Sequence, residues 1–326
     1  MNKYFGLFFC LPVVLTVAVM IVTPVRAVGD EKPKAANSVG SANTVISAKA
    51  GGSRIRITTT ARLAGAIHSL TWQGKEFIDS HDHGRQLQSA SNFDCGKRFI
   101  AETFNPTEAV SVFDGAGETS SSKLLFIRAK GNELITRNQM AFWLRPSGNS
   151  LGNPARNKTI LSNHIVKKHV RIGYKKLTHV IQYAVTFTVP KGEPHTYAQF
   201  EAVTGYMPVA FKRFMVFDVG SGKLKSISVG PGEQRKPVVL ATVDGKHAMG
   251  IYSPDQPSKG FSHAGYGRFE HKAAKVVKWN CVFRTPRGQA VKAGDYSFRN
   301  FVLVGDVEQV TGDMVKLHAM FPGQGK

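Results

Sequence analysis

Apolar and polar residues alternate with a period of two along much of the chain. The alternation is clearest in residues 54–58, 123–128, 180–189, 196–203 and 276–283. Successive side chains of a strand point to opposite faces, so this period predicts β-strands that are buried on one side. The same segments are rich in Val, Ile, Phe, Tyr and Thr, which suit a pleated surface. Strands are therefore expected to dominate the fold.

Turn residues interrupt these apolar segments at short intervals. The predicted turns are residues 73–75, 114–117, 130–132, 191–194, 221–223 and 244–246, and longer exposed loops are expected at 115–123 and 146–159. Such glycine-containing turns are typical of hairpins and meanders. Because no helical pattern recurs between the strands, the sequence predicts an all-β protein, an antiparallel sandwich or barrel, rather than a parallel α/β sheet.

One helix is expected, at the C-terminal end of the chain. Asp306 is a suitable N-cap and Gln309 follows it three residues later. Apolar residues then recur at helical spacing at Val307, Val310, Met314 and Leu317, and Pro322 and Gly323 are expected to end the helix. The predicted helix is short and comes after all of the predicted strands.

The first 27 residues have the features of a secretory signal peptide. Lys3 precedes an apolar run over residues 5–22, and residues 25–27 (Val-Arg-Ala) offer a cleavage site. An uncleaved membrane anchor is the competing interpretation, because the run is nearly long enough to span a bilayer. Residues 28–44 are small and polar, as in a disordered linker. We therefore expect a single β-sandwich domain over residues 45–326.

The chain is strongly basic and has few cysteines. Its 326 residues include 43 Lys and Arg against 22 Asp and Glu, a formal net charge of +21. If the protein is secreted or periplasmic, this charge favours acidic polysaccharide or another envelope polyanion as partner, and nucleic acid is not expected. The alternative is that the charge only maintains solubility. After loss of Cys10 with the signal peptide, Cys95 and Cys281 either form one disulfide or remain buried thiols.

The densest polar segment is His81-Asp82-His83-Gly84-Arg85-Gln86-Leu87-Gln88. If it is a strand, His81, His83 and Arg85 share one face, and Gln86 points to the other. This face is compatible with sugar or anion binding, with a metal site, or with an ordinary solvated strand. No further ligand follows at a suitable spacing, so nothing in the sequence requires a metal or another cofactor.

A second polar face is predicted in the segment that begins at His195. His195, Tyr197, Gln199 and Glu201 alternate with smaller or apolar residues. Such a row can line a cleft for a hydroxyl-rich ligand, or it can be the solvent side of a strand. His195 and Glu201 are about 20 Å apart along an extended strand, so they cannot serve one reacting centre by themselves. We expect either one to face His81 or His83 across a cleft.

A third set of candidates lies in segments expected to be loops. Tyr252 and Asp255 belong to one of them, and Arg268 follows a Gly-Tyr-Gly sequence in the other. Aromatic faces together with Arg or Asp hydrogen bonds are suited to saccharide recognition. Several enzyme classes are not supported, because the chain has no G-x-S-x-G elbow, no phosphate-binding G-x-x-x-x-G-K-[ST] loop and no H-E-x-x-H motif.

Residues 63–78, LAGAIHSLTWQGKEFI, resemble the opening hairpin of galactose-mutarotase-like proteins. Gly84-Arg85-Gln86 looks like the place where that superfamily offers an arginine to the sugar, and His195-Thr196-Tyr197 is loosely similar to its N-H-x-Y-F segment. The chain also looks like a set of secreted bacterial proteins, through residues 105–109 (NPTEA) and 279–284 (WNCVFR).

This resemblance implies an antiparallel β-supersandwich whose concave sheet binds carbohydrate. In mutarotases of the superfamily a Glu removes the anomeric hydroxyl proton and a His protonates the ring oxygen. Transferred to this chain, Arg85 would bind sugar and His195 would be the acid. The late Glu motif of the family has no convincing match here. Glu201 and His83 are the remaining catalytic candidates, from the polar segments described above.

Three hypotheses of function follow from the sequence. The first is a secreted carbohydrate-active enzyme that performs acid–base chemistry on a saccharide, as an epimerase, mutarotase, lyase or hydrolase. The second is a non-catalytic polysaccharide-binding protein that uses the same groove. The third is a basic protein of the cell envelope. In the first two, Arg85, His195 and Glu201 are expected to surround one cleft.

Overall fold

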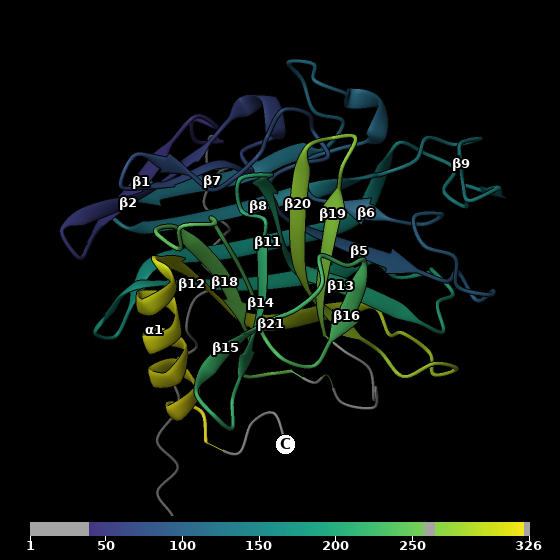
Figure 1. Cartoon of the computed structure of the whole chain (residues 1–326). Helices are drawn as coiled ribbons and strands as arrows, with labels where there is room; N and C mark the ends of the chain where they lie inside the picture. The colour runs from purple at the N-terminus through teal and green to yellow at the C-terminus, as the bar shows by residue number, and fades with distance from the viewer. Residues whose placement is uncertain (1–38, 257, 259–264, 323–326) are drawn as a thin grey trace, which may run out of the picture. The chain divides into compact units, whose positions relative to one another are not determined.

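Antiparallel strands form most of the chain in the computed structural model, which describes residues 39–256, 258 and 265–322 (Figure 1). In the first half these are β1 (Val45–Ala50), β2 (Ser53–Thr59), β3 (Ile67–Trp72), β4 (Lys75–Glu76), β5 (Leu87–Phe93), β6 (Pro106–Thr107), β7 (Lys123–Lys130), β8 (Glu133–Phe142), β9 (Asn149–Ser150), β10 (Asn153–Pro154) and β11 (Leu161–Tyr174).

The second half continues with equally regular strands. They are β12 (Leu177–Val189), β13 (Ala198–Pro208), β14 (Arg213–Asp218), β15 (Lys223–Ser226), β16 (Gly232–Gln234), β17 (Val238–Ala241), β18 (Ala248–Tyr252), β19 (Tyr266–His271), β20 (Val276–Arg284) and β21 (Gly294–Gly305). The helical elements are η1 (Ala61–Leu63), η2 (Val112–Asp114) and α1 (Val307–Ala319). The predicted all-β class is confirmed.

Backbone pairing arranges these strands in two antiparallel layers. The first layer runs β7-β8-β11-β12-β21-β18-β17-β14-β15. The second runs β1-β2-β3-β5-β13-β20-β19-β16, and β6 joins the layers by pairing with both β5 and β8. Phe187 of β12 and Phe200 of β13 meet in the main core with ring centroids 5.2 Å apart. The two layers therefore pack as a sandwich.

The C-terminal helix covers the outer face of the first layer. In β21, Val302 faces the main core, whereas Phe301 and Leu303 face a second apolar cluster that contains the buried residues of α1. The carboxylate of Asp306 accepts a hydrogen bond from Gln309 N at 2.7 Å. Capping and the apolar stripe thus confirm the predicted helix, and Figure 1 shows it beside β12 and β18.

The period-two segments correspond to β2, β7, β12, β13 and β20. The predicted turns at 73–75, 130–132, 221–223 and 244–246 join paired strands, as expected. The other two predicted turns lie in longer connections, at the end of η2 and between β12 and β13. Within the predicted loop at 146–159, β9 and β10 form a small separate hairpin.

The N-terminal predictions lie largely outside the described residues. The signal peptide over residues 1–27, which contains Cys10, lies outside them, as do residues 28–38 of the linker. The signal peptide, the disordered linker and the extent of the domain therefore stay predictions. The first strand begins at Val45.

Cys95 and Cys281 are free thiols, and burial raises the pKa of Cys95 to about 12. No helix of the described residues is long and apolar enough to cross a membrane.

A buried ion pair connects the two layers inside the sandwich. Lys168 of β11 contacts the Glu108 carboxylate, and neither side chain is exposed to solvent. Glu108 also accepts a hydrogen bond from Ser89 N at 3.0 Å, while the Lys168 ammonium lies 5.6 Å from the Tyr183 ring centroid. A buried charge without its partner is strongly destabilising, so each member of this pair depends on the other.

We predict that Lys168→Met lowers the free energy of unfolding by about 3–5 kcal/mol, because it leaves the Glu108 carboxylate buried without a counter-charge. Urea denaturation measures this change. The double variant Lys168→Met with Glu108→Gln should recover part of the loss. The exposed Arg128, paired with Glu133 at 3.3 Å, supplies the control, since Arg128→Ala should leave the urea midpoint unchanged. Equal midpoints for Lys168→Met and the parent would contradict the prediction.

Candidate functional site

The outer face of the second layer is polar where β5, β13 and β20 lie side by side. All seven residues of β5 are buried, so both of its faces are covered. Ser89 points inward, where its hydroxyl lies 3.1 Å from that of Tyr183 in the first layer. Its neighbour Gln88 lines a pocket on the outer face, as does Asn92. The alternation in β5 thus separates the core from a polar outer surface.

A β-bulge in β13 adds further polar residues to this outer surface. The register against both neighbouring strands shifts just after Glu201. Gln199 and Glu201 lie on one face before the bulge, and Tyr206 reaches the same pocket after it. Thr204 also turns to that face, because its hydroxyl donates to Glu201 Oε2 at 3.0 Å. A bulge re-aims side chains in this way.

These side chains enclose a pocket of about 160 Å³, which we call the Glu201 pocket. It is lined by Gly84, Gln88, Ala90, Asn92, Ala101, Glu102, Asn105, Thr107, Trp143, Gln199, Glu201, Tyr206 and Lys278. The wall thus combines two aromatic rings, several amides, two carboxylates and one ammonium. Amides, carboxylates and hydroxyls that converge beside aromatic faces are suited to polar ligands with a flat apolar side.

Glu201 is held as a carboxylate at the base of this pocket. Its Oε2 atom accepts from Thr204, from Asn280 Nδ2 at 3.3 Å and from the Lys278 ammonium at 3.5 Å. Burial alone would raise the pKa of Glu201, but Lys278 and these hydrogen bonds lower it below the ordinary value of 4.5. Among the described residues all of these contacts use Oε2, so Oε1 is left to accept a bond from a ligand.

Lys278 is fixed between Glu201 and two aromatic rings. Its ammonium lies 5.0 Å from the Tyr206 ring centroid and 5.3 Å from that of Phe269. Burial would lower the pKa of Lys278, yet the neighbouring Glu201 carboxylate raises it overall. The charges of Lys278 and Glu201 therefore compensate each other, while Glu102 adds a second carboxylate to the pocket wall.

One buried polar atom of the pocket has no partner. Gln88 donates from Nε2 to Gly84 O at 3.3 Å, whereas its Oε1 makes no hydrogen bond within the described part of the chain. A buried polar atom without a partner costs free energy, so an unpaired amide oxygen in a pocket wall favours a ligand or water there.

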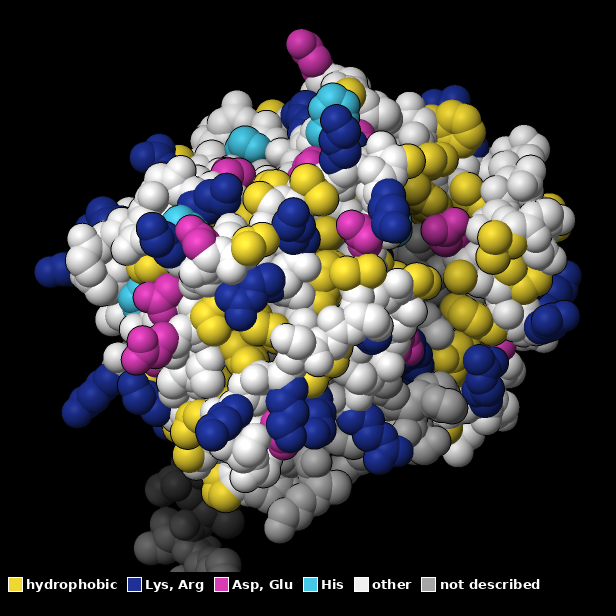
Figure 2. Space-filling model, in the orientation of Figure 1, with side chains coloured by type: hydrophobic (Ala, Val, Ile, Leu, Met, Phe, Trp, Pro, Cys, Tyr) yellow, Lys and Arg dark blue, Asp and Glu magenta, His cyan; other side chains and the backbone are white. Residues whose placement is uncertain are grey.

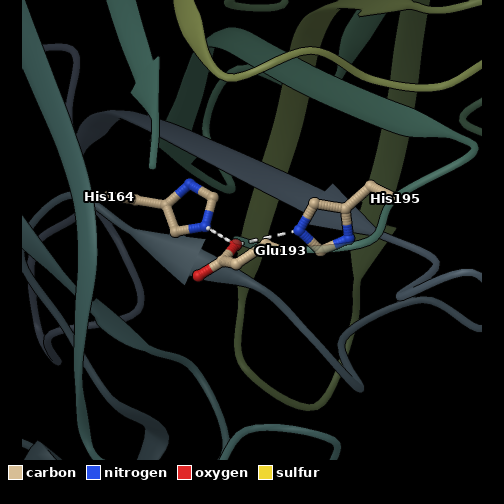
Figure 3. A group of neighbouring side chains, drawn as sticks. All are labelled: His164, Glu193 and His195. Carbon is tan, nitrogen blue, oxygen red and sulfur yellow. Dashed lines mark hydrogen bonds and ion pairs between the residues drawn. The ribbon is translucent and has the colours of Figure 1, made fainter. Parts of the chain in front are cut away.

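A larger pocket, of about 790 Å³, is lined by a different set of residues, and we call it the His195 pocket. His195 and Glu193 are in its wall together with the basic side chains Lys97, Arg156 and Lys158. Behind the wall, His164 of β11 reaches the same carboxylate. Figure 3 shows both imidazoles directed at one oxygen of Glu193, with Nε2–Oε2 distances of 2.7 Å for His164 and 2.9 Å for His195.

The protonation of this group follows from its burial. Burial lowers the pKa of His164 below 6.5, although the Glu193 carboxylate opposes that shift. Burial would raise the pKa of Glu193, but the hydrogen bonds with the two imidazoles outweigh this effect and lower the pKa to about 2. At neutral pH the group therefore contains an ionised carboxylate beside a neutral His164.

The structure places two of the three predicted catalytic residues, Glu201 and His195, in different pockets, and the third, His83, lines neither. Glu201 and Gln199 line the Glu201 pocket, whereas His195 lines the His195 pocket. His195 precedes β13, so the expected single face from His195 to Glu201 does not form. The catalytic roles of His195 and Glu201 stay predictions, but their expected meeting with His81 or His83 is not found among the described contacts.

The segment from His81 to Gln86 is a turn and not the expected strand. This corrects the prediction that His81, His83 and Arg85 share a strand face. Arg85 instead forms an ion pair at 2.8 Å with Asp82, which precedes it by three residues in the turn. Residues three apart point to opposite faces of a strand, whereas in this turn Asp82 and Arg85 come into contact.

The three remaining polar side chains of this turn have different surroundings. His83 is fully buried, and its two ring nitrogens lie 2.8 Å from Gly115 O and from Arg62 O, so both are used by the main chain. Gln86 is also buried and donates to His83 O at 2.7 Å. His81 is exposed. A structural role for His83 and Gln86 accounts for these contacts, and their functional roles stay predictions.

The candidates from the predicted loops lie apart from both pockets. Tyr252 ends β18 and packs in the second apolar cluster under α1, and Asp255 forms an ion pair with Arg299 at 2.6 Å. Arg268 of β19 donates to Ser228 O at 2.6 Å and to Gln234 Oε1 at 2.7 Å. None of the three lines either pocket, so their predicted sugar contacts stay untested.

Several residues of the Glu201 pocket were not predicted from the sequence. Lys278 is a charged residue in the interior of the largely apolar strand β20, which ends at Arg284, and a charge at such a position is a signal of a buried partner. Trp143 and Asn105 lie outside long alternating segments and gave no such signal. Tyr206 was missed because the bulge in β13 breaks the period on which the prediction depended.

Comparisons with known proteins give matches among solved structures only. No family model matches the chain, and no curated protein matches its sequence. An α-galactosidase from Lactobacillus brevis is 9% identical with a TM-score of 0.45, and the match covers 86% of this chain but 42% of that one. An α-mannosidase from Enterococcus faecalis V583 is 10% identical with a TM-score of 0.46, over 86% and 32% of the two chains. The chain thus spans less than half the length of both proteins.

A galactose mutarotase related enzyme from Lactobacillus acidophilus is also similar. It is 9% identical with a TM-score of 0.42, and the match covers 81% of this chain and 98% of that one. The site itself is defined by this chain's own residues.

We predict that Lys278→Met raises the pKa of Glu201 above 4.5, because burial then acts on the carboxylate without the opposing ammonium. In the parent protein the folded-state pKa lies below 4.5, so the pair stabilises the fold at neutral pH. That contribution is lost only as the pH falls through the folded-state pKa. Carbon-13 NMR titration of the Glu201 carboxyl, assigned with Glu201→Gln, measures the shift. An unchanged or lower pKa in Lys278→Met would mean that the ammonium does not control this carboxylate.

Proposed function

We propose that the protein binds a saccharide, with one sugar unit in the Glu201 pocket. The observation that supports this most directly is the combination of Trp143 and Tyr206 with a free carboxylate oxygen on Glu201 and an unpaired amide oxygen on Gln88. Sugar hydroxyls donate to such oxygens, and the C–H faces of a sugar ring pack on aromatic side chains.

The size and charge of the pocket limit which kind of saccharide it can bind. Its volume of about 160 Å³ is below the ~300–1,000 Å³ of pockets for drug-sized ligands, which suits a single sugar ring better than a longer fragment. The pocket wall holds two carboxylates, Glu102 and Glu201, against the single ammonium of Lys278, so it offers no net positive charge to an acidic sugar. We therefore propose a neutral sugar unit, and Glu201 acts as hydroxyl acceptor.

Attraction of acidic polysaccharide, expected from the net charge of +21, has a different origin. Figure 2 shows Lys and Arg side chains spread over the visible face, with Asp and Glu between them, and not collected in one groove. Such dispersed charge attracts polyanions without a defined site and weakens as salt screens it. Binding in the pocket and binding to the surface are therefore separable by salt.

We predict that Glu201→Gln and Trp143→Ala each weaken the binding of a neutral oligosaccharide at least about tenfold. Loss of a hydrogen bond to a charged group costs about 1.5–3 kcal/mol, which corresponds to this factor or more. Glycan-array screening selects the ligand, and calorimetry in 150 mM and 500 mM salt measures its affinity. Glu133→Gln, at a half-buried strand carboxylate on β8 that lines neither pocket, is the matched control and should bind like the parent.

The outcomes separate the hypotheses. Salt-resistant binding that both variants weaken supports the proposal, and turnover of the bound glycan that Glu201→Gln removes adds a catalytic role for this residue. Binding that the two variants leave unchanged contradicts the proposed pocket. Retention of acidic chains alone, lost in high salt, supports the alternative of a basic cell-envelope protein instead.

We also propose that the protein is exported, to the periplasm or outside the cell. This proposal is supported by Lys3, the apolar run over residues 5–22 and the Val-Arg-Ala sequence at 25–27. N-terminal sequencing of the protein recovered from the cell envelope and the medium should give a chain that begins at Val28. A chain that retains Met1 and fractionates with membranes would support the anchor, and one that retains Met1 in the cytoplasm would contradict export.

A further inference from the structure

The His164, Glu193 and His195 group has a geometry that the saccharide pocket does not explain. None of the three residues lines the Glu201 pocket. His164 and His195 are 1% and 3% exposed, and the nearest ligand-type atoms of the three residues all lie within 4.8 Å of one another. Figure 3 shows the imidazoles approaching the carboxylate from two sides.

We propose that His164, Glu193 and His195 bind a divalent transition-metal ion such as Zn²⁺. Two imidazole nitrogens and one carboxylate oxygen are a preferred ligand set for this ion. At metal–ligand distances of about 2.0–2.1 Å, adjacent ligand atoms of a tetrahedral site are ~3.3 Å apart. The observed Nε2–Oε2 distances of 2.7 and 2.9 Å are about 0.5 Å shorter than this spacing, and the ligand atoms as a set lie within 4.8 Å of one another, so all three side chains must adjust to admit the ion.

Rigid packing holds the two imidazoles in this arrangement. The ring of Phe93 packs against both, with centroid distances of 4.8 Å to His164 and 4.5 Å to His195. Phe104 packs against the same two rings at 6.0 and 5.3 Å. Aromatic walls limit the rotation of both histidines, so the ligand atoms are already gathered before an ion arrives.

The position of the group beside the His195 pocket makes the proposed ion accessible. Glu193 and His195 are in the pocket wall, and 22% of the Glu193 side chain is exposed, so solvent reaches the group from the carboxylate side. Three protein ligands with an open position on the solvent side are typical of catalytic zinc sites, whereas structural zinc sites are closed by four protein ligands. The structure thus assigns a metal site of the open kind to the His195 pocket.

The test is calorimetric titration of Zn²⁺ into the untagged full-length protein after removal of metals with a chelator. We expect about one Zn²⁺ per chain, and at least about hundredfold weaker binding in Glu193→Gln and in His195→Ala, since even residues that only support a ligand change affinity 10–100-fold. The matched control is His169→Ala. His169 Nε2 lies 2.7 Å from Glu133 Oε1, but this half-buried pair has no third ligand within the described part of the chain, and its loss should leave Zn²⁺ binding unchanged.

A spectroscopic measurement on the parent protein does not depend on how the variants fold. Co²⁺ in a four-coordinate site absorbs strongly in the visible range, and we expect this band to appear at one equivalent and to be displaced by Zn²⁺. Absence of stoichiometric Zn²⁺ binding, or of the Co²⁺ band, overturns the proposal. Zn²⁺ binding that is unchanged in folded Glu193→Gln and His195→Ala also overturns it. Loss of Zn²⁺ binding in His169→Ala would place the ion at the other pair instead. The glycan experiments use other residues and are decided separately.

Discussion

The pairing of β13 between β5 and β20 is the constraint that shapes the rest of this structure. It places Phe200 in the sandwich core and Gln199 and Glu201 on the opposite face. The bulge after Glu201 then keeps Tyr206 on the same outer face, although strict alternation would have reversed it. A packed core and a polar pocket are thus built from one strand.

Electrostatics follow from the same arrangement. Glu201 and Lys278 come from neighbouring strands, and their attraction offsets part of the desolvation cost of placing two charges on a largely buried sheet. Inside the sandwich, the buried charges of Lys168 and Glu108 likewise compensate each other. In both cases each charge is held beside a partner of opposite sign.

Much of the fold could be predicted from the sequence, because alternation and turn chemistry are local properties. The strands β2, β7, β12 and β20 and the capped helix α1 follow directly from such patterns. The site could be predicted only in part. Gln199 and Glu201 were found from their period, whereas Lys278 joins them through pairing with a distant strand, which no local pattern specifies.

The incorrect expectations have equally physical reasons. The segment around His83 has strand-like spacing, but main-chain carbonyls from two other segments bind its imidazole in a turn. The group of His164, Glu193 and His195 gave no metal motif, since His164 lies 29 residues from Glu193 in sequence and its strand brings it close. Long-range topology, and not residue type, determines which polar groups meet.

A crystal structure of the full-length protein with a bound neutral oligosaccharide is the sharpest test of the proposed pocket. We expect one sugar ring in the Glu201 pocket, packed on Trp143 or Tyr206, with a hydroxyl within hydrogen-bond distance of Glu201 Oε1. A sugar bound at another surface, with the Glu201 pocket occupied only by water, would contradict the proposal.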